Sequence, residues 1–409
     1  MGAKMATTAH SARPAAEPAA AISSVLGDDD LLGEILLRLA LPTDLVRAAA
    51  VCRRWLRAAS HPAFLRRFRG LHPPRLLGFY LTAWLIHDER WLVDFTPMLP
   101  QPPELAAVLR RGSFSLDSCV GSSTHLMVCR NGTVLVSLHR GGYHTHAVHS
   151  PLHPPRGLAI LPALPTKKTD KQHPFHIFHE VLCRDGRDGL SYFFFSLDYI
   201  GEDQATAHVY ELQDDIWRLH GTATTHVSMA SHKMILEMPR ILLVDDRICM
   251  ALNVNCILVW DLTSSAFCTI ELPDKTFSNG DIVLSRADVS GFYLVHVNEL
   301  QLRIWLHIGG NGSLGDWSLV DTVSLHDMCA NLRTSSATAA GGDAPDVYIH
   351  EVGDNADFAF LEMYGCVVYL DVRSRAMHKV YDLTAKGLCH CRINSFMMIW
   401  PPIFPALKE

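Results

Sequence analysis

The 409-residue chain lacks the patterns that mark membrane, secreted and zinc-stabilised proteins. No apolar run approaches the ~20 residues of a membrane-spanning helix. The first twenty residues have no continuous apolar core of the kind found in signal peptides. Eleven cysteines are scattered without any Cys-x-x-Cys pair, which indicates neither a disulfide framework nor a common zinc motif. We therefore expect a soluble protein without a membrane partner, in a reducing compartment: the cytoplasm, the nucleus or both.

Signatures of catalysis are also missing. The chain contains no H-E-x-x-H, no G-x-S-x-G and no paired carboxylates in a catalytic setting. The stretch Gly309–Gly315 has the composition of a phosphate loop, but it lacks a lysine and leads into Trp317 within a strand pattern rather than a helix. A hairpin loop is the better interpretation. We expect no catalytic residues, no cofactor and no enzymatic activity.

Two groups of histidines and cysteines invite a metal interpretation. The first group comprises His139, His144, His146, His149 and His153. Two of these imidazoles would share one face of a strand, but no carboxylate or cysteine stands at ligand spacing and Gly-Gly and Pro-Pro flank the group, so a solvated loop is predicted. The second group, Cys389-His390-Cys391, could complete a site only with distant residues, so a buried strand with one outward histidine is predicted. No metal site is expected.

Positive charge is concentrated in one short segment. The formal net charge of the chain is −6, yet Leu45–Leu76 holds eight Arg and no Asp or Glu. Such a series could bind nucleic acid. Arginines on solvated helix faces, with their stems covering apolar surface, are the better explanation, and we expect no nucleic-acid partner.

Three zones of the chain differ in pattern. Residues 1–21 are rich in Ala and Pro and are expected to form a disordered leader. Residues 22–70 have the apolar periodicity of helices, whereas residues 75–405 alternate short β-type runs with turn residues. A Ser/Thr/Ala/Gly stretch at about 331–345 is expected to be an inserted surface loop. The expected fold class is α+β and multidomain: a small helical domain followed by an all-β domain.

The helical zone opens with Asp28, Asp29 and Asp30. Asp suits a helix N-terminus because it caps free N–H groups and favours the positive end of the helix dipole. The apolar positions that follow share one helix face: Leu31, Leu32, Ile35, Leu36 and Leu39. Pro42 is expected to end this helix, Thr43 to cap the next one, and Pro62 to occupy the first turn of the last.

The small size of this helical zone has a consequence. A bundle of about 50 residues buries too little surface to be securely stable alone. Part of its apolar first helix is therefore expected to stay uncovered, and a large exposed apolar patch marks an interaction site. Periodicity alone leaves two interpretations open: the helix binds another protein, or it packs on the following β domain.

Residue identities in this zone resemble an F-box. The F-box pattern is Leu-Pro-x-Asp-x-Leu-x-x-Glu-Ile-Leu-x-Arg-Leu, then a Pro, then Leu-x-x-x-x-x-Val-Cys-x-x-Trp, then a Pro-x-Phe. The matching residues are Leu26, Asp29 or Asp30, Leu32, Glu34, Ile35, Leu36, Arg38, Leu39, Pro42, Leu45, Val51, Cys52, Arg54, Trp55, Pro62 and Phe64. Gly27 stands where F-boxes carry Pro, so the entry segment is expected to be looser. His72–Phe79 is similar to the segment that follows the F-box in plant proteins.

The resemblance implies that residues 22–70 form an F-box that binds a Skp-type adaptor and, through it, the cullin of an SCF (Skp–cullin–F-box) ubiquitin ligase. The contacts carried over, of which some must be internal core, are Leu26, Leu31, Leu32, Ile35, Leu36, Pro42, Leu45, Val51 and Trp55. A fully buried Leu or Ile contributes roughly 1.5–3 kcal/mol, whereas association costs roughly 4–15 kcal/mol. About five or six apolar anchors would therefore suffice, and two would not.

The β-rich zone repeats a theme without repeating residues: a strand-like run with an aromatic, a polar turn, then a second aromatic strand. The aromatic pairs are Tyr210 and Trp217, Trp260 and Phe267, Trp305 and Trp317, and Tyr369 and Tyr381. The first members lie 50, 45 and 64 residues apart, a period typical of propeller blades. The Gly-Gly of kelch blades and a repeated Trp-Asp are missing, so a divergent β-propeller of about six or seven blades is predicted, with a β-sandwich or jelly roll as the alternative.

A second resemblance joins the two zones. The segment Cys129–Leu138 is similar to part of the propeller-like domain that follows plant F-boxes. The resemblance implies a non-catalytic substrate receptor, in which the F-box docks the adaptor and the β domain recruits a target protein that the sequence does not identify. The alternative is a stand-alone propeller binding protein, or a propeller enzyme, with a degenerate F-box, and Gly27 motivates it.

Overall fold

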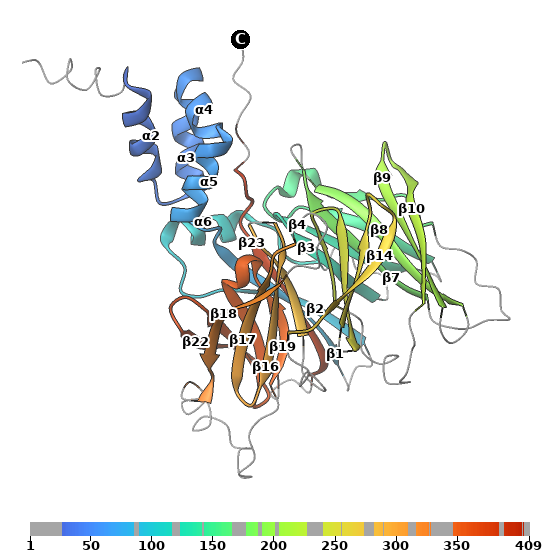
Figure 1. The fold of residues 1–409 in the computed structure, drawn as a ribbon. Helices are drawn as coiled ribbons and strands as arrows, with labels where there is room; N and C mark the ends of the chain where they lie inside the picture. The colour runs from blue at the N-terminus through green and yellow to red at the C-terminus, as the bar shows by residue number, and fades with distance from the viewer. Residues whose placement is uncertain are drawn as a thin grey trace, which may run out of the picture. The chain divides into compact units, whose positions relative to one another are not determined.

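The computed structural model describes residues 27–85, 90–116, 123–140, 143–165, 177–186, 190–200, 204–226, 240–254, 256–273, 282–288, 290–309, 316–326, 328, 347–383, 388–402 and 404. The chain divides into two compact units. The helical unit is Met1–Arg75 together with Met398–Glu409, and the strand unit is Leu76–Met397 (Figure 1). The range 75–405 expected for the β domain thus extends past the boundary at Met397. No helix in the described part of the chain is long and apolar enough to cross a membrane.

The described part of the helical unit contains four helices. They are α2 (Asp29–Leu37), α3 (Pro42–Ala49), α4 (Arg53–Ser60) and α5 (Pro62–Leu71). Asp28 caps α2, since one oxygen of its carboxylate accepts hydrogen bonds from the backbone N–H of Asp30 (2.9 Å) and of Leu31 (3.1 Å). The prediction that Asp residues start this helix is therefore confirmed in detail.

The proline positions differ in part from the prediction. α2 ends at Leu37, and Pro42 occupies the first turn of α3, where its missing N–H leaves no hydrogen bond unmade. The prediction that Thr43 caps α3 is wrong: the helix already includes Thr43, and Leu41 stands at the N-cap without a side-chain hydrogen bond. Pro62 occupies the first turn of α5 as predicted.

The core of the helical unit is a single apolar cluster. Its buried members are Leu32, Leu36, Leu37, Leu45, Ala49, Ala59 and Phe68. Three of them come from α2, where Leu32 and Leu36 share one helix face because they are four residues apart. Trp400 and Phe404, from the other end of the chain, pack against this cluster.

Six antiparallel sheets form the described part of the strand unit, so the propeller prediction is confirmed and the sandwich alternative is wrong. Blade 1 contains β3 (Ser123–Arg130), β4 (Thr133–Arg140), β5 (Tyr143–His149) and β6 (Leu158–Ile160). Blade 2 contains β7 (Ile177–Asp185), β8 (Leu190–Ile200), β9 (Gln204–Gln213) and β10 (Ile216–His226). Blade 3 contains β11 (Arg240–Val244), β12 (Arg247–Val254), β13 (Cys256–Asp261) and β14 (Ala266–Glu271).

The remaining blades complete the circle. Blade 4 contains β15 (Ile282–Arg286), β16 (Phe292–Asn298), β17 (Gln301–His307) and β18 (Trp317–Ser324). Blade 5 contains β19 (Tyr348–Val352), β20 (Phe358–Met363), β21 (Cys366–Asp371) and β22 (Ala376–Asp382). Blade 6 contains β23 (Leu388–Met397), β1 (Leu76–Leu85) and β2 (Arg90–Pro97). The connections carry α6 (Pro103–Arg111) and the 3-10 turns η2 (Pro154–Arg156) and η4 (Asp354–Ala356).

One strand from each blade lines the centre. The inner strands β3, β7, β11, β15, β19 and β23 contact one another in a closed ring. The two ends of the strand unit close this ring, because β1 pairs antiparallel with β23 and Leu76 lies opposite Met397. The inner strand of blade 6 is therefore the last strand of the unit, and its outer two strands are the first.

Two-residue turns join several neighbouring strands. Asn131-Gly132, Asp214-Asp215 and Asp245-Asp246 all have positive φ at both residues. A type I′ turn requires this backbone, and Asn, Asp and Gly are the residues that adopt it at the lowest cost. These short polar pairs therefore set the register of the hairpins they connect.

The aromatic period seen in the sequence marks equivalent strands. Its first members, Tyr210, Trp260, Trp305 and Tyr369, lie on β9, β13, β17 and β21, the third strands of four successive blades. The second members, Trp217, Phe267, Trp317 and Tyr381, lie on the fourth strands. Trp260 is fully buried and stacks on Phe267, with 5.5 Å between ring centroids. The repeat is thus a structural one: blades 2 to 5 each carry one aromatic on the third strand and one on the fourth.

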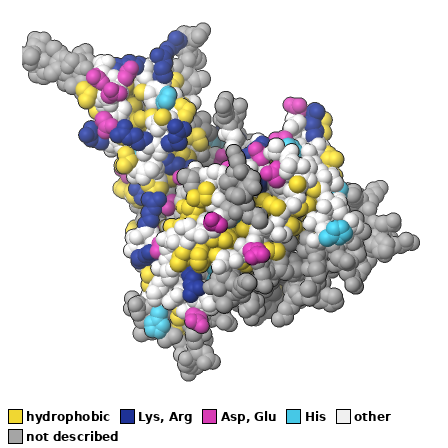
Figure 2. Space-filling model, viewed as in Figure 1, with side chains coloured by type: hydrophobic (Ala, Val, Ile, Leu, Met, Phe, Trp, Pro, Cys, Tyr) yellow, Lys and Arg dark blue, Asp and Glu magenta, His cyan; other side chains and the backbone are white. Residues whose placement is uncertain are grey.

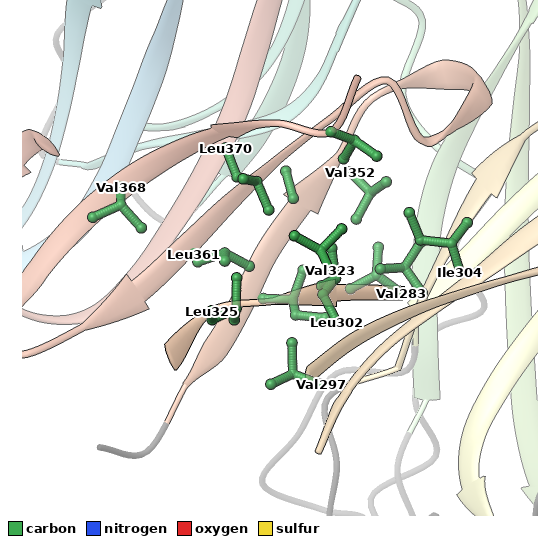
Figure 3. Close-up of a cluster of buried hydrophobic side chains, with 14 of the residues drawn as sticks. Val283, Val297, Leu302, Ile304, Val323, Leu325, Val352, Leu361, Val368 and Leu370 are labelled. Atoms are coloured by element: carbon green, nitrogen blue, oxygen red, sulfur yellow. The ribbon is translucent and has the colours of Figure 1, made fainter. Parts of the chain in front are cut away.

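Aliphatic side chains fill the space between adjacent blades, as the contact between blades 4 and 5 illustrates (Figure 3). Blade 4 contributes Val283, Val297, Leu302, Ile304 and Val323, and blade 5 contributes Val352, Leu361, Val368 and Leu370. All of these side chains are buried. Burial of this kind is the main stabilising contribution to the packing of one blade on the next.

Four of the five histidines lie on strands, so the solvated-loop prediction is wrong for them: His139 is on β4, and His144, His146 and His149 are on β5, while His153 lies in the connection before η2. His146 and His149 are buried on β5, and His149 Nε2 lies 2.7 Å from the carbonyl oxygen of Ser113. Among the described residues, no group of three or more His, Cys, Asp or Glu could hold a metal ion. Cys389-His390-Cys391 lies on β23, while the leader 1–21 and the predicted loops 310–315 and 331–345 lie outside the described residues.

Candidate functional site

The nine residues carried over as adaptor contacts divide into inner and outer positions. Four are buried in the helical unit: Leu32, Leu36, Pro42 and Leu45. Leu31 is 45% exposed and Val51 is 66% exposed, whereas Ile35 and Trp55 are partly buried. Leu26 lies outside the described residues. Four positions are therefore accessible to a partner, and we call them the outer apolar residues: Leu31, Ile35, Val51 and Trp55.

Arg54 links the two segments that carry the exposed members of this set. Its Nε donates a hydrogen bond to Asp29 Oδ1 (2.7 Å), and its Nη2 donates one to the carbonyl oxygen of Gly27 (2.7 Å). Leu31 follows Asp29 by two residues and Val51 precedes Arg54 by three. The link therefore holds the N-terminal end of α2 against that of α4, and it anchors the backbone at Gly27, although glycine supplies no side chain.

α5 is fastened to α2 by two further interactions. Arg67 Nη2 donates to Glu34 Oε1 (2.6 Å), and His72 Nε2 lies 2.8 Å from the carbonyl oxygen of Leu37. The first is an exposed ion pair and contributes little to stability by itself. The second is partly buried and lies directly after the helix. Together they make the placement of α2, and hence of Leu31, dependent on α5.

Charge surrounds these apolar positions. Asp29 and Asp30 lie in the first turn of α2, and Arg53, Arg57 and Arg66 are exposed on α4 and α5. Figure 2 shows basic, acidic and hydrophobic side chains together on the visible face of the helical unit. An apolar centre with a charged rim is the composition of a protein–protein interface.

The propeller has a charged cluster of its own, at the carboxyl ends of its inner strands. Arg130 ends β3 and pairs with Asp185, which ends β7, and with Asp354 of η4, with 3.2 Å between Nη2 and Oδ2 in the second pair. Arg286 ends β15, lies 3.8 Å from Asp185 and donates to the carbonyl oxygen of Cys183 (2.6 Å). Four blades thus meet through two arginines and two aspartates.

The two arginines of this cluster titrate differently. The pKa of Arg286 is lowered to about 10. Burial is the largest cause, and the neighbouring positive charge of Arg130 is the second. Burial also opposes charge on Arg130, but Asp354 and Asp185 outweigh it and raise the pKa of Arg130 above its usual range. Arg130 is therefore the arginine that interacts most strongly with the carboxylates of Asp185 and Asp354.

A second set of polar contacts crosses the ring nearer the amino ends of the inner strands. Arg240 on β11 donates to Tyr348 Oη (2.8 Å) and to the carbonyl oxygen of Ile349 (3.1 Å) on β19. Arg392 on β23 lies 3.4 Å from Glu180 on β7. Each contact passes over one intervening blade. Side chains therefore connect non-adjacent blades at two levels of the inner ring: at the carboxyl ends of the inner strands and nearer their amino ends.

Glu351 on β19 lies between these two sets. Burial raises its pKa to about 7, although hydrogen bonds from the backbone N–H and the hydroxyl of Ser395 on β23 act in the opposite direction. Burial likewise raises the pKa of the Cys183 thiol on β7 to about 12. Because the thiolate is the reactive form, this cysteine is a poor nucleophile at neutral pH.

Several of these residues were missed by reasoning from the sequence. Arg54 was matched to the F-box pattern without a role, and Arg130, Arg286 and Glu351 were not singled out. Their partners lie far away in the sequence, as with Arg130 and Asp354, which are 224 positions apart. The available signal was an Arg or Asp at the end of a short apolar strand, directly before turn residues.

Comparison with known families matches both units of the chain. A family model described as "F-box-like" matches residues 29–69, and one described as "F-box protein AT5G49610-like, beta-propeller" matches residues 125–404. The second match covers more than half of the chain. No curated protein matches the sequence.

The chain is also similar to solved structures of other proteins. For AztD from Citrobacter koseri the identity is 10%, with 78% of this chain and 98% of that chain covered and a TM-score of 0.34. For a hypothetical selenium-binding protein from Sulfolobus tokodaii the identity is 10%, with 75% and 74% covered and a TM-score of 0.39. For a protein from Lactobacillus plantarum the identity is 10%, with 77% and 99% covered and a TM-score of 0.33.

Proposed function

Because this chain belongs to the family of F-box proteins with an AT5G49610-like β-propeller, we propose that it is the substrate-recognition subunit of an SCF-type ubiquitin ligase. The helical unit binds a Skp-type adaptor, the adaptor connects it to a cullin, and the propeller recruits a target protein in the cytoplasm, the nucleus or both. The subunit itself performs no chemistry. It raises the effective concentration of the target lysine near the ubiquitin-loaded enzyme, so that transfer becomes nearly intramolecular.

The exposure of Leu31 and Val51 beside the Arg54–Asp29 link supports this proposal most strongly. Single exposed apolar residues are ordinary, but these two lie at positions that the F-box resemblance gives as contacts, Leu31 in α2 and Val51 in the connection that leads into α4, and the Arg54–Asp29 link joins these helices. With Ile35 and Trp55, full burial would contribute at most roughly 6–12 kcal/mol, at about 1.5–3 kcal/mol for each side chain moved from full exposure, because all four are already partly buried. This is within the range of association costs, so the charged rim is expected to contribute to affinity as well.

Replacing the exposed residues tests the proposal. The full-length Leu31→Asp, Val51→Asp double variant is expected to bind a purified Skp-type adaptor at least about 100-fold more weakly in calorimetry, because two charges would be buried against an apolar partner. Both positions are exposed, so the chain is expected to fold normally. Leu45→Asp would be a poor test, since Leu45 is fully buried and the variant would lose the core.

Leu319→Asp is the matched control. Leu319 lies on β18 of the propeller and is 48% exposed, close to the 45% of Leu31. It is expected to leave adaptor binding unchanged. Failure of the intact chain to bind the adaptor, or unchanged binding by the folded double variant, would contradict the proposal. Target capture that persists in the double variant would then favour a stand-alone propeller binding protein with a degenerate F-box.

A further inference from the structure

The residues that follow the last propeller strand belong to the helical unit. Met398 and its successors leave β23 and join Met1–Arg75 in one compact body. The backbone N–H of Met398 donates to the carbonyl oxygen of Arg75 (2.9 Å), and Met398 and Pro402 are buried. We call Met398–Phe404 the C-terminal segment.

Trp400 of the C-terminal segment covers the most deeply buried aromatic ring of the helical unit. Its ring stacks on Phe68, with 6.0 Å between centroids and 9° between planes. Phe68 is fully buried and also contacts Phe64 at 6.0 Å and His72 at 4.7 Å. Phe68 lies on α5, so part of its burial comes from a residue more than 300 positions further along the chain.

The C-terminal segment adds buried apolar surface to a helical bundle that is too small to bury much by itself. An aromatic side chain buries roughly 150–250 Å², and both Trp400 and Phe404 pack against the buried cluster of Leu32, Leu36, Leu45 and their neighbours. A unit of this size gains a large share of its stability from each such contact. The helical unit is therefore completed by two rings that lie outside the F-box match at 29–69.

The contacts of α5 give this packing a functional consequence. Trp400 holds Phe68 on α5, and α5 in turn contacts α2 through Arg67–Glu34 and through His72 and the Leu37 carbonyl. α2 carries Leu31. We propose that the C-terminal segment is a structural part of the F-box, and that Trp400 is a positioning residue for adaptor binding. This inference rests on the proposed function as far as the adaptor is concerned.

Because Trp400 is synthesised after the propeller, the helical unit can be completed only once the whole propeller sequence has been made. β23 must be synthesised before the C-terminal segment, and it forms the inner strand of blade 6 by pairing with β1, which directly follows the helical residues. A chain that ends inside the propeller has helices α2–α5 but no Trp400. Strong adaptor binding is then restricted to chains that contain the complete propeller sequence.

Two substitutions at one position test the inference in the full-length protein. Trp400→Ala is expected to weaken binding of a purified Skp-type adaptor by about tenfold or more, because Phe68 loses the ring that covers it. It is also expected to speed amide hydrogen exchange in α5 while exchange in the blades stays unchanged. Trp400→Phe keeps a flat ring and is expected to restore most of the affinity and of the protection.

Trp217→Ala is the matched control. Trp217 is a partly buried tryptophan on β10, and its Nε1 donates to the carbonyl oxygen of Pro162. Its replacement is expected to alter exchange in blade 2 and to leave α5 and the adaptor affinity unchanged. Wild-type adaptor affinity for Trp400→Ala, or no rescue by Trp400→Phe, would overturn the positioning role. If the wild-type chain does not bind the adaptor, the proposed function fails separately, and unchanged α5 exchange in Trp400→Ala would still overturn the structural role.

Discussion

Arg130 at the end of β3 and Asp354 in η4 form an ion pair with 3.2 Å between Nη2 and Oδ2, although their strands belong to blades 1 and 5. The inner strand of blade 6, β23, lies between those blades in the ring. Arg130 also pairs with Asp185 of blade 2. One arginine thus connects the blades on either side of the point where the two ends of the propeller meet.

Replacing Arg130 is expected to destabilise the propeller. Arg130→Leu removes the arginine that pairs with both Asp185 and Asp354, and removing one partner of a partly buried ion pair is costly. The three side chains are between 23% and 38% exposed, so solvent reduces the effect. We expect the free energy of unfolding to fall by about 1–3 kcal/mol, measured by chemical denaturation.

An exposed pair within one hairpin provides the control for Arg130. Arg218 lies 3.6 Å from Asp214, and their side chains are 56% and 89% exposed. Arg218→Leu is expected to change the free energy of unfolding by less than about 0.5 kcal/mol. Equal effects of the two substitutions would show that the Arg130 cluster does not hold the blades together. A double-mutant cycle with Asp354→Asn isolates the coupling across blade 6.

Glu351 is expected to make stability fall as pH rises. Burial raises its pKa from 4.5 to about 7, so between these values the folded protein binds more protons than the unfolded chain. Stability from this residue is therefore fully present below about pH 4.5 and is lost as pH rises to about 7. Glu351→Gln is expected to remove this slope and to raise the free energy of unfolding at pH 8 by roughly 1–3 kcal/mol.

Comparing unfolding curves at pH 5 and pH 8 measures this effect. Glu104→Gln is the control, because Glu104 is an exposed carboxylate on α6. Its replacement is expected to leave the difference in stability between the two pH values as in the wild type. If Glu351→Gln has that same difference, the carboxyl of Glu351 titrates alike in the folded and unfolded states.

Local patterns in the sequence predicted the elements well. The Asp28 cap, the first-turn Pro62 and the aromatic period from Tyr210 to Tyr369 all depend on residues within one helix or one hairpin, and the structure confirms them. The predicted cap at Thr43 is wrong by two positions, because Pro42 starts α3 and Leu41 takes the cap. Propensity alone does not decide between adjacent residues at a helix end.

Long-range contacts were beyond the same reasoning. Nothing near Arg130 in the sequence indicates Asp354, and nothing near Phe68 indicates Trp400, because ring closure brings these residues together. His146 was assigned to a solvated loop because Gly-Gly and Pro-Pro surround the histidine group, yet it is buried on β5. The F-box contacts separated into buried and exposed positions only once the packing of α2 was known.

Ser265 is expected to be a site where glycine stabilises the fold. It precedes β14 with φ of 54°, a left-handed backbone that costs a residue with a Cβ roughly 1–2 kcal/mol. Ser265→Gly removes this cost but increases the entropy of the unfolded chain, so we expect a net gain of about 0.5 kcal/mol in denaturant unfolding. Arg375 occupies the equivalent turn of blade 5 with φ of 60° and pairs with Asp321 at 2.6 Å.

Arg375→Gly tests the reason for that gain. It relieves the same backbone cost but removes the Arg375–Asp321 ion pair, so its effect on the free energy of unfolding is expected to be smaller than that of Ser265→Gly. The opposite order would mean that backbone strain at these turns is relieved by their surroundings.

Arg54→Ala is expected to weaken adaptor binding without unfolding the helical unit. The substitution frees Asp29 and the Gly27 carbonyl, so the N-terminal end of α2 is no longer held against α4. Ordering that end then becomes part of the cost of binding. We expect an affinity for the Skp-type adaptor about tenfold lower than wild type in calorimetry, and faster amide exchange in the first turn of α2.

Arg57→Ala separates this role from a general effect of positive charge. Arg57 lies on the same helix, three positions further along, and is exposed. Both substitutions lower the net positive charge of α4 by one, so a purely electrostatic attraction to the adaptor would weaken equally in both variants and would depend on salt. If the Arg54–Asp29 link positions Leu31 beside Val51, only Arg54→Ala lowers the affinity strongly, and raising the ionic strength does not abolish the difference. Equal loss in both variants would assign Arg54 to the charged rim instead.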